Sequence, residues 1–340
     1  MFHSGQRLAT AFVLAVAATL AVAVAPSWAT YHGKNGRIAF RRYFNNDHSK
    51  SAIFTVNPDG TGQTQITHPP KGSVDDQPDW SPDGSLIAFT RCPNNGACAV
   101  YTVHADGSGL KRLSPVCSGV PPNCEDDANV TFLPDGKHVA FTRASGNDKH
   151  FQDGNDQIQH SDVVVSDLNG GNRRIVLSSG EYKADYNFAY FSPDGKRFVY
   201  EHANSPLSKP AHTSALFVAN SDGSGDHRIT PWSLDAGDNP DWSPDGQWIL
   251  FRTHVNTDKN SSIEIIHPDG TGRKQLANYG PNANMRSATF SPDGKWIVLA
   301  TNKGKGNSNP AVYVMQIDAN HLQLVTHSKL WDSAADWGTG

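Results

Sequence analysis

A short motif recurs along this 340-residue chain at intervals of about 50 residues: an aromatic residue, Ser-Pro-Asp-Gly and then an apolar run. Self-similarity at such a period indicates a repeat architecture, in which every unit folds alike. Truncated copies lie near both ends, Asn35-Gly36 before Ile38 and Asp336-Trp337-Gly338. The copies between them begin at Trp80, Phe132 (with Leu for Ser), Phe191, Trp242 and Phe290.

Each unit reads as four short strands separated by tight turns. In the second unit, Pro82-Asp83-Gly84 and Asp106-Gly107 are typical turn sequences, because Pro fixes φ and Gly accepts positive φ. The apolar runs between the turns are short and β-branched, which excludes pairs of helices. The predicted strands of this unit are Gln77–Trp80, Leu86–Thr90, Val100–Val103 and Leu110–Leu113. We therefore predict an all-β protein, a six-bladed β-propeller of four-stranded antiparallel blades.

The two ends of the chain complement each other. The chain begins with the second strand of a blade and ends with the first strand of one. We expect Ala335–Trp337 to pair beside Arg37–Phe40, which would close the ring and remove two exposed sheet edges. The aromatic residue of each motif should pack between neighbouring blades. These aromatics are Trp80, Phe132, Phe191, Trp242, Phe290 and Trp337.

The repeat resembles the propeller repeats of the TolB type. The resemblance rests on the aromatic-Ser-Pro-Asp-Gly turn, the Ile-Ala-Phe strand and the second Asp-Gly turn, and it covers nearly all of 30–340. TolB-type proteins carry an α/β domain before the propeller, and we expect the propeller alone here. Similar units occur in the prolyl oligopeptidase family, whose Gly-x-Ser-x-Gly nucleophile motif is absent from this sequence.

Residues 1–29 are predicted to be a signal peptide. Leu8–Ala25 is uncharged and apolar, and Ser27-Trp28-Ala29 supplies small residues for cleavage. The alternative is a retained membrane anchor. The propeller domain would then be 30–340, secreted or periplasmic, with no later membrane span. We expect a monomer.

Net charge and cysteine content indicate which partners and which cross-links to expect. The net charge is −4, which gives no reason to expect a nucleic-acid partner. The four Cys residues of an exported chain favour two disulfides, Cys92–Cys98 and Cys117–Cys124, each across one short loop. Zinc ligation is the alternative, although the spacings are wider than usual for zinc.

Loops on one face of the predicted propeller are the candidates for binding. The turns after the first and third strands are near-identical between units, whereas the connections on the opposite face vary and are rich in His. The longest insertion is Ala144–Ser161. The candidate binding residues are His150, Asp153, Asp156, His160, His202, His212 and His254.

Acidic residues directly precede the predicted first strand of several units, near the predicted central channel. They are Asp76, Asp127, Asp185 and Asp238. Several carboxylates around one channel would repel one another and attract Ca²⁺. The alternative, which the pattern favours, is that each Asp caps its own turn. The sixth unit has Met285-Arg286 instead, which either weakens the metal interpretation or marks the place of an anion.

Two functions follow from these features. The first is an exported, non-catalytic propeller that binds a protein or a glycan through the variable loop face. The alternative is a metal-assisted glycan lyase or hydrolase that uses the His and Asp residues of that face, as in some pectin-degrading propellers. We assign no catalytic residue and expect no enzyme, because no catalytic motif is present.

Overall fold

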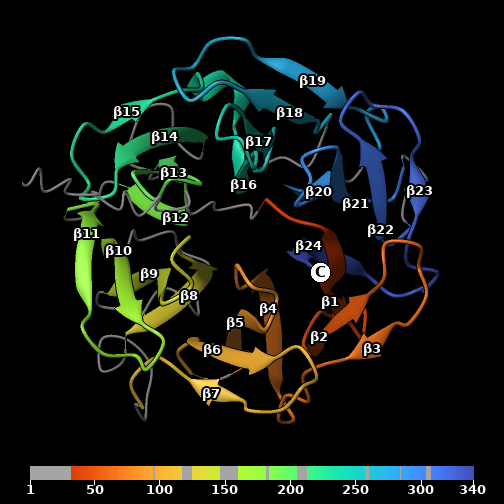
Figure 1. Ribbon diagram of the computed structural model, residues 1–340, viewed down its shortest axis with the longest axis horizontal. Helices are drawn as coiled ribbons and strands as arrows, with labels where there is room; N and C mark the ends of the chain where they lie inside the picture. Colours follow the sequence, from red (N-terminus) through yellow and green to blue (C-terminus); the bar gives the residue numbers. More distant parts are fainter. Residues whose placement is uncertain are drawn as a thin grey trace, which may run out of the picture.

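The computed structural model describes residues 32–94, 96–116, 125–145, 160–180, 184–204, 213–256, 260–283, 285–303 and 308–340. Within these ranges the chain folds into strands β1 to β24 and one short 3-10 helix, η1 (Trp232–Leu234), so the predicted all-β class is confirmed. The strands form sheets that stand around a common centre (Figure 1). None of the helices in these ranges has the length and hydrophobicity that crossing a membrane requires.

The strands follow the sequence repeat. Repeat 1 unites the last strand with the first three, and repeats 2 to 6 follow in chain order. Repeat 1 comprises β24 (Asp332–Thr339), β1 (Asn35–Tyr43), β2 (Ser51–Val56) and β3 (Thr64–Gln65). Repeat 2 comprises β4 (Ser73–Trp80), β5 (Leu86–Pro93), β6 (Ala99–His104) and β7 (Lys111–Arg112). Repeat 3 comprises β8 (Asp126–Phe132), β9 (His138–Ser145), β10 (His160–Asp167) and β11 (Arg174–Ser178).

The remaining repeats have the same order of strands. Repeat 4 comprises β12 (Ala184–Phe191), β13 (Arg197–Asn204), β14 (Ser214–Asn220) and β15 (His227–Arg228). Repeat 5 comprises β16 (Gly237–Trp242), β17 (Ile249–Arg252), β18 (Ile263–Ile266) and β19 (Lys274–Ala277). Repeat 6 comprises β20 (Met285–Phe290), β21 (Trp296–Thr301), β22 (Ala311–Gln316) and β23 (Gln323–Leu324). The first strand of each repeat lies nearest the centre (Figure 1).

Repeats 3 to 6 each form a separate four-stranded antiparallel sheet. Repeats 1 and 2 share one eight-stranded sheet, because β2 and β4 meet in parallel at the pair Ser51 and Val74. The C-terminal strand β24 pairs antiparallel with β1, with Trp337 opposite Ile38. Segments from the two ends of the chain are thus neighbours in one sheet.

The Ser-Pro-Asp-Gly motif forms the turn after the first strand. In repeat 2 the Ser81 hydroxyl donates to the Asp83 carboxylate at 2.7 Å and accepts from the Leu86 amide at 2.8 Å. Gly84 closes the turn with its amide on the Ser81 carbonyl and a φ of +68°, which favours glycine. The same contacts recur around Ser192, Ser243 and Ser291. The motif therefore has a structural role.

The hydrophobic core lies between successive repeats. Trp337 packs in one cluster with Val298 and Val312 of repeat 6, and Phe132 packs with Ala88 of repeat 2. All six motif aromatics are buried, as predicted. Each aromatic occupies the same place in its own interface between repeats. The apolar area buried on folding is therefore divided among a series of similar interfaces and does not form one central core.

One of the two predicted disulfides is formed within the described residues. Cys92 and Cys98 form this disulfide, whereas Cys117 and Cys124 lie outside the described residues.

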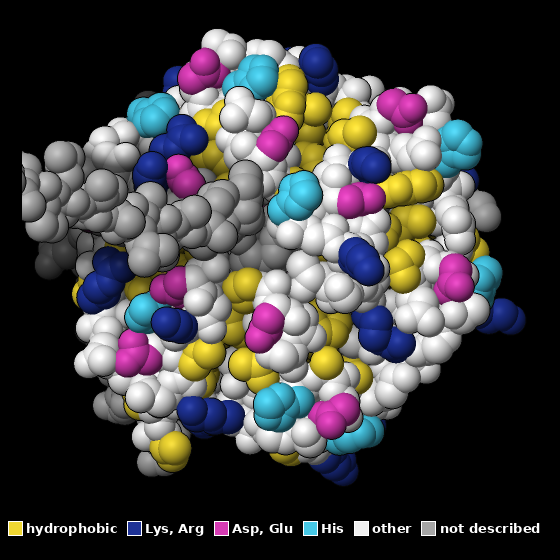
Figure 2. Space-filling model, viewed as in Figure 1, with side chains coloured by type: hydrophobic (Ala, Val, Ile, Leu, Met, Phe, Trp, Pro, Cys, Tyr) yellow, Lys and Arg dark blue, Asp and Glu magenta, His cyan; other side chains and the backbone are white. Residues whose placement is uncertain are grey.

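On the face seen in Figure 2, acidic, basic and His side chains are scattered around the rim. No patch of one sign dominates that face, as the small net charge suggests.

Candidate binding site

The first strand of each repeat is interrupted by a β-bulge. Pairing between β4 and β5 slips between Asp76 and Asp79, and a comparable slip occurs in the first strands of the other repeats. Gln77, Asn239 and Ala334 have φ values of +52°, +60° and +49° there. A bulge bends its strand and re-aims its side chains. The residues four and three positions before the motif aromatic are called the bulge pair below.

Four bulge pairs meet at a cavity of about 210 Å³. These pairs come from repeats 2, 5, 6 and 1, so residues far apart in the sequence share one site. The cavity is lined by Asp76, Gln77, Asp238, Asn239, Arg286, Ser287, Ser333 and Ala334, together with Arg41 of β1. Its charged side chains are two arginines and two aspartates.

Arg41 is held on one side of this cavity by neighbouring strands. Its guanidinium forms an ion pair with Asp76 and donates a hydrogen bond of 2.5 Å to the Ser333 hydroxyl. It also lies over the Tyr43 ring, 4.4 Å from the ring centroid. The second oxygen of Asp76 accepts the Gln77 amide at 2.7 Å. These contacts fix the positions of both charges.

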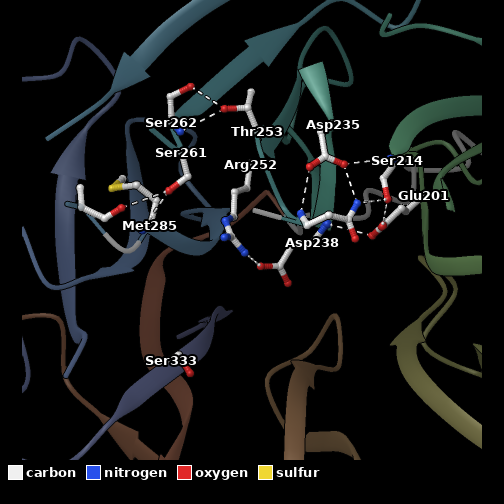
Figure 3. Close-up of polar contacts among 12 residues, drawn as sticks. Glu201, Ser214, Asp235, Asp238, Arg252, Thr253, Ser261, Ser262, Met285 and Ser333 are labelled. Atoms are coloured by element: carbon white, nitrogen blue, oxygen red, sulfur yellow. Dashed lines mark hydrogen bonds and ion pairs between the residues drawn. The ribbon is translucent and has the colours of Figure 1, made fainter. Parts of the chain in front are cut away.

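Asp238 is held on the opposite side by β17 and β13 (Figure 3). Its carboxylate accepts a 2.7 Å bond from buried Arg252, and its amide donates to Glu201 at 3.0 Å. The other Glu201 oxygen accepts the Ser214 hydroxyl at 2.6 Å. Burial raises the pKa of Glu201 to about 7. A Cβ at Gly237 would lie 2.4 Å from the Glu201 carboxyl carbon, so a larger residue there would displace this carboxylate.

The four carboxylates predicted as metal ligands have different environments. Asp76 and Asp238 line the cavity in their ion pairs. Asp127 is buried and accepts Arg143 at 2.8 Å. Asp185 is half-buried, and burial raises its pKa to about 6. Among the described residues no three His, Cys, Asp or Glu side chains could hold one metal ion.

All four of these aspartates lie inside β-strands, which corrects the expectation that they precede the first strands. Strand pairing continues past the bulge, so Asp127 stands opposite Arg143 on the neighbouring strand. Two further pairs of this kind, Asp75 with Arg91 and Asp332 with Arg42, stabilise the same position in repeats 2 and 1. Asp75, Asp127 and Asp332 therefore each form an ion pair with an arginine of the neighbouring strand in their own sheet.

The predicted binding histidines are not brought together in the described part of the chain. His202 lies in β13, not in a loop, and its ring contacts Tyr186, Phe217 and Trp232 with centroids about 5 Å apart. Burial lowers its pKa to about 4. His254 follows β17, where its amide donates to the Leu234 carbonyl. His160 begins β10, and His150, Asp153, Asp156 and His212 lie outside the described residues.

A second set of aspartates was missed from the sequence. Asp79, Asp241 and Asp336 each directly precede a motif tryptophan and are buried or nearly so. Each accepts a backbone amide of a motif aromatic in another repeat, at 2.6 to 2.8 Å. Alignment of the six motifs would have shown this position. Thr131 and Thr289 occupy it in repeats 3 and 6, where their hydroxyls donate to carbonyls.

Burial raises the pKa of two of these acids, Asp79 and Asp336. It raises the pKa of Asp336 to about 6. It also raises the pKa of Asp79 well above its ordinary value, and the neighbouring charges of Asp336 and Asp241 add to that shift. Desolvation therefore favours the neutral form of Asp79 and Asp336, and both carboxyl groups accept backbone amides across the interface between repeats.

Comparison with known proteins gives partial matches in sequence. No protein-family model matches the chain. The uncharacterised peptidase YuxL of Bacillus subtilis is 29% identical over 160 residues, covering 41% of this chain and 23% of YuxL. The Tol-Pal system protein TolB of Francisella tularensis subsp. mediasiatica is 27% identical over 133 residues, covering 38% of this chain and 29% of TolB. Both matches span less than a third of the relative's length.

Solved structures match over most of the chain. TolB from Acinetobacter baumannii has a TM-score of 0.65 at 18% identity and covers 90% of this chain and 67% of that one. A chain of the nidogen/laminin complex has a TM-score of 0.62 at 11% identity, and the match covers 89% of this chain and 98% of that one. Oligogalacturonate lyase in complex with manganese has a TM-score of 0.55 at 14% identity, and the match covers 88% of this chain and 77% of that one. The fold is therefore a TolB-like β-propeller, which confirms the predicted resemblance.

The prediction that the chain is no enzyme is overturned by these matches. YuxL bears the name of a peptidase, and the lyase is an enzyme with the same fold. Because enzymes also use this propeller, the lack of a familiar catalytic motif does not exclude catalysis.

Proposed function

We propose that the chain is an exported six-bladed propeller that binds a partner protein where the bulge pairs meet. In this proposal repeats 1 and 2 are separate blades that touch at one strand pair, and the pairing of β24 with β1 closes the ring. Residues 1–29 act as the signal peptide, and the propeller works in the periplasm or outside the cell.

One observation carries the proposal. The first strands are alike at the motif aromatic, yet their bulge pairs differ in charge and size, from Arg286-Ser287 to Ser333-Ala334. A repeat that is uniform in its core and variable at one end of its central strands is expected of a rigid scaffold that presents a specific surface. Hydrogen-bonded bulge residues with positive φ also keep that surface preorganised.

The neighbours are consistent with a protein partner. TolB is named as a Tol-Pal system protein, and another neighbour belongs to a nidogen/laminin complex. A glycan partner is the alternative, and the oligogalacturonate lyase supports testing it together with turnover. Charged side chains at the cavity would steer such a partner and set its orientation.

Capture from the cell envelope of the producing organism tests the proposal. The immobilised protein would be compared with Arg286→Ser and with Lys295→Ser, a control in the same repeat. Lys295 is an exposed residue of the turn at the other end of β20. Both changes remove one positive charge and install the residue found at the equivalent position of another repeat, Ser333 or Ser85.

We expect one protein to be retained by the wild type and by Lys295→Ser but not by Arg286→Ser. Equal retention by both variants would contradict binding at the bulge pairs. Incubation with oligogalacturonate and Mn²⁺ forms the second arm of the experiment. Product formation that is lost in Arg286→Ser would favour the glycan enzyme over the protein-binding role.

A further inference from the structure

We propose that the cavity between the bulge pairs binds a small zwitterion with one carboxylate and one ammonium group, of which a free α-amino acid is the simplest case. The inference rests on the proposed function in one respect: both assume that the place where the bulge pairs meet is accessible to a binding partner. It does not require the partner protein, so the two can fail separately.

The size and charge of the cavity set the ligand class. Its volume of about 210 Å³ lies below the roughly 300 Å³ at which pockets for drug-sized ligands begin. Arg41 and Arg286 bring positive charge to its lining, and Asp76 and Asp238 bring negative charge. A simple anion would face both aspartates, and a simple cation would face both arginines. A zwitterion places opposite charges against opposite charges.

Buried polar atoms at the cavity call for a ligand that both donates and accepts hydrogen bonds. The Ser287 hydroxyl and the Asn239 amide oxygen have no hydrogen-bond partner among the described residues, although their side chains are 3% and 6% exposed. Arg41 Nε is a buried donor in the same condition. Buried groups of this kind normally have partners. An ammonium group could donate to Asn239, and a carboxylate could accept from Arg41 Nε.

The charged side chains are already fixed before a ligand arrives. Arg41 is held by Asp76 and Ser333, and Asp238 is held by Arg252 at 2.7 Å. The Arg286 guanidinium lies over the Trp331 ring, 5.0 Å from its centroid. A ligand would therefore bind without first paying the entropy of ordering these long side chains.

Titration calorimetry with three small probes tests the ligand class. L-Alanine carries both charged groups, acetate carries the carboxylate alone, and methylammonium carries the cation alone. We expect saturable binding of L-alanine, with acetate and methylammonium at least about tenfold weaker, since each lacks one charge-assisted contact. Acetate or methylammonium binding as tightly as L-alanine would overturn the zwitterion assignment. So would the absence of L-alanine binding.

Two variants locate the binding in the cavity. Ser287→Ala installs the residue that repeat 1 carries at the same position, Ala334, and Arg286→Ser installs its neighbour Ser333. Both should bind L-alanine at least about tenfold more weakly. Lys295→Ser, on the turn at the other end of β20, should bind like the wild type. Unchanged affinity in both cavity variants, with melting temperatures showing that they are folded, would overturn the proposed site.

If L-alanine binds but no envelope protein is captured, the cavity inference survives and the protein-binding role fails. If a protein is captured in an Arg286-dependent way but none of the probes binds, the cavity inference fails alone. Competition distinguishes the remaining case: L-alanine that releases the captured protein would show that both use the same charged groups.

Discussion

Asp336 shows how a single carboxylate can link stability to pH in this fold. It is largely buried in β24 beside Asp79, and its oxygen accepts the Trp80 amide at 2.8 Å. Its pKa of about 6 in the folded protein lies above its ordinary value of 3.8, so protonation favours the folded state. Its stabilising effect is complete below pH 3.8 and is lost as the pH rises through about 6. Asp79 shifts in the same direction.

Asp336→Asn should therefore stabilise the protein at pH 8. Asn imitates the protonated acid and keeps an oxygen for the Trp80 amide, while it removes a buried charge. We expect a gain of about 2 to 3 kcal/mol in the free energy of unfolding at pH 8, which shrinks toward zero at pH 4. Chemical denaturation at several pH values measures this. Asp318→Asn, on an exposed turn, is the control. It should leave the pH dependence of the free energy of unfolding unchanged above pH 5. A variant less stable than the wild type at pH 8 would contradict the argument.

At the scale of single elements, the bulge in each first strand is what turns a structural repeat into a candidate site. Non-glycine residues hold a left-handed backbone there, although L-residues lose roughly 1–2 kcal/mol in that conformation. In β24 the strained residue is Ala334, with φ +49°, and the next residue, Ala335, is not in the positive-φ region. Both side chains are buried.

Comparing Ala334→Gly with Ala335→Gly measures the strain of the bulge. Each change removes one buried methyl group and adds the same flexibility to the unfolded chain. Only the Ala334→Gly variant gains the freedom to adopt positive φ without strain. We expect it to be more stable than the Ala335→Gly variant by about 1–2 kcal/mol in urea denaturation. Equal stability of the two variants would mean that the bulge carries no strain.

Turns and strands of this protein could be predicted from sequence because their signals are local. Pro, Asp and Gly specify each turn within five residues, and Gly84 takes up the expected positive φ. The bulges could not be predicted, because Gln77, Phe188 and Ala334 share no chemical property that signals a left-handed backbone. The strain there follows from how the strands pair around the centre, which is a property of the assembled sheets.

The candidate site was less predictable than the fold. The partners Asp75 and Arg91 are 16 residues apart, as are Asp127 and Arg143. Their pairing depends on the register between two strands, so the sequence showed acids near a channel but not the arginines that neutralise them. Arg286 was interpreted either as a break in the acidic series or as an anion contact, and the structure places it in the lining of the cavity. Asn239 and Ser287 carry no sequence signal, because only their burial without partners distinguishes them.

At the scale of the whole molecule, the proposed ring depends on the contact between the two ends of the described chain. Strand β24 pairs with β1, the Gly340 amide donates to the Lys34 carbonyl at 2.9 Å, and Trp337 packs against repeat 6. Residues 330–340 also bring Asp336 to repeat 2. A single strand thus links repeat 1 to the repeats on both sides of it, as a closing element must.

Deletion of residues 330–340 should open this ring. The edge of β1 and the apolar surface under Trp337 would both become exposed, so we expect a fall of about ten degrees or more in melting temperature, the effect of a few kcal/mol, and rapid proteolysis. A circular permutant is the matched control. Its new ends lie between the exposed residues Pro70 and Lys71, and a short linker joins Gly340 to Lys34. The permutant makes repeat 1 continuous and retains every strand, so it should melt close to the wild type. An unstable permutant, or a stable deletion, would show that the ring is not closed by β24.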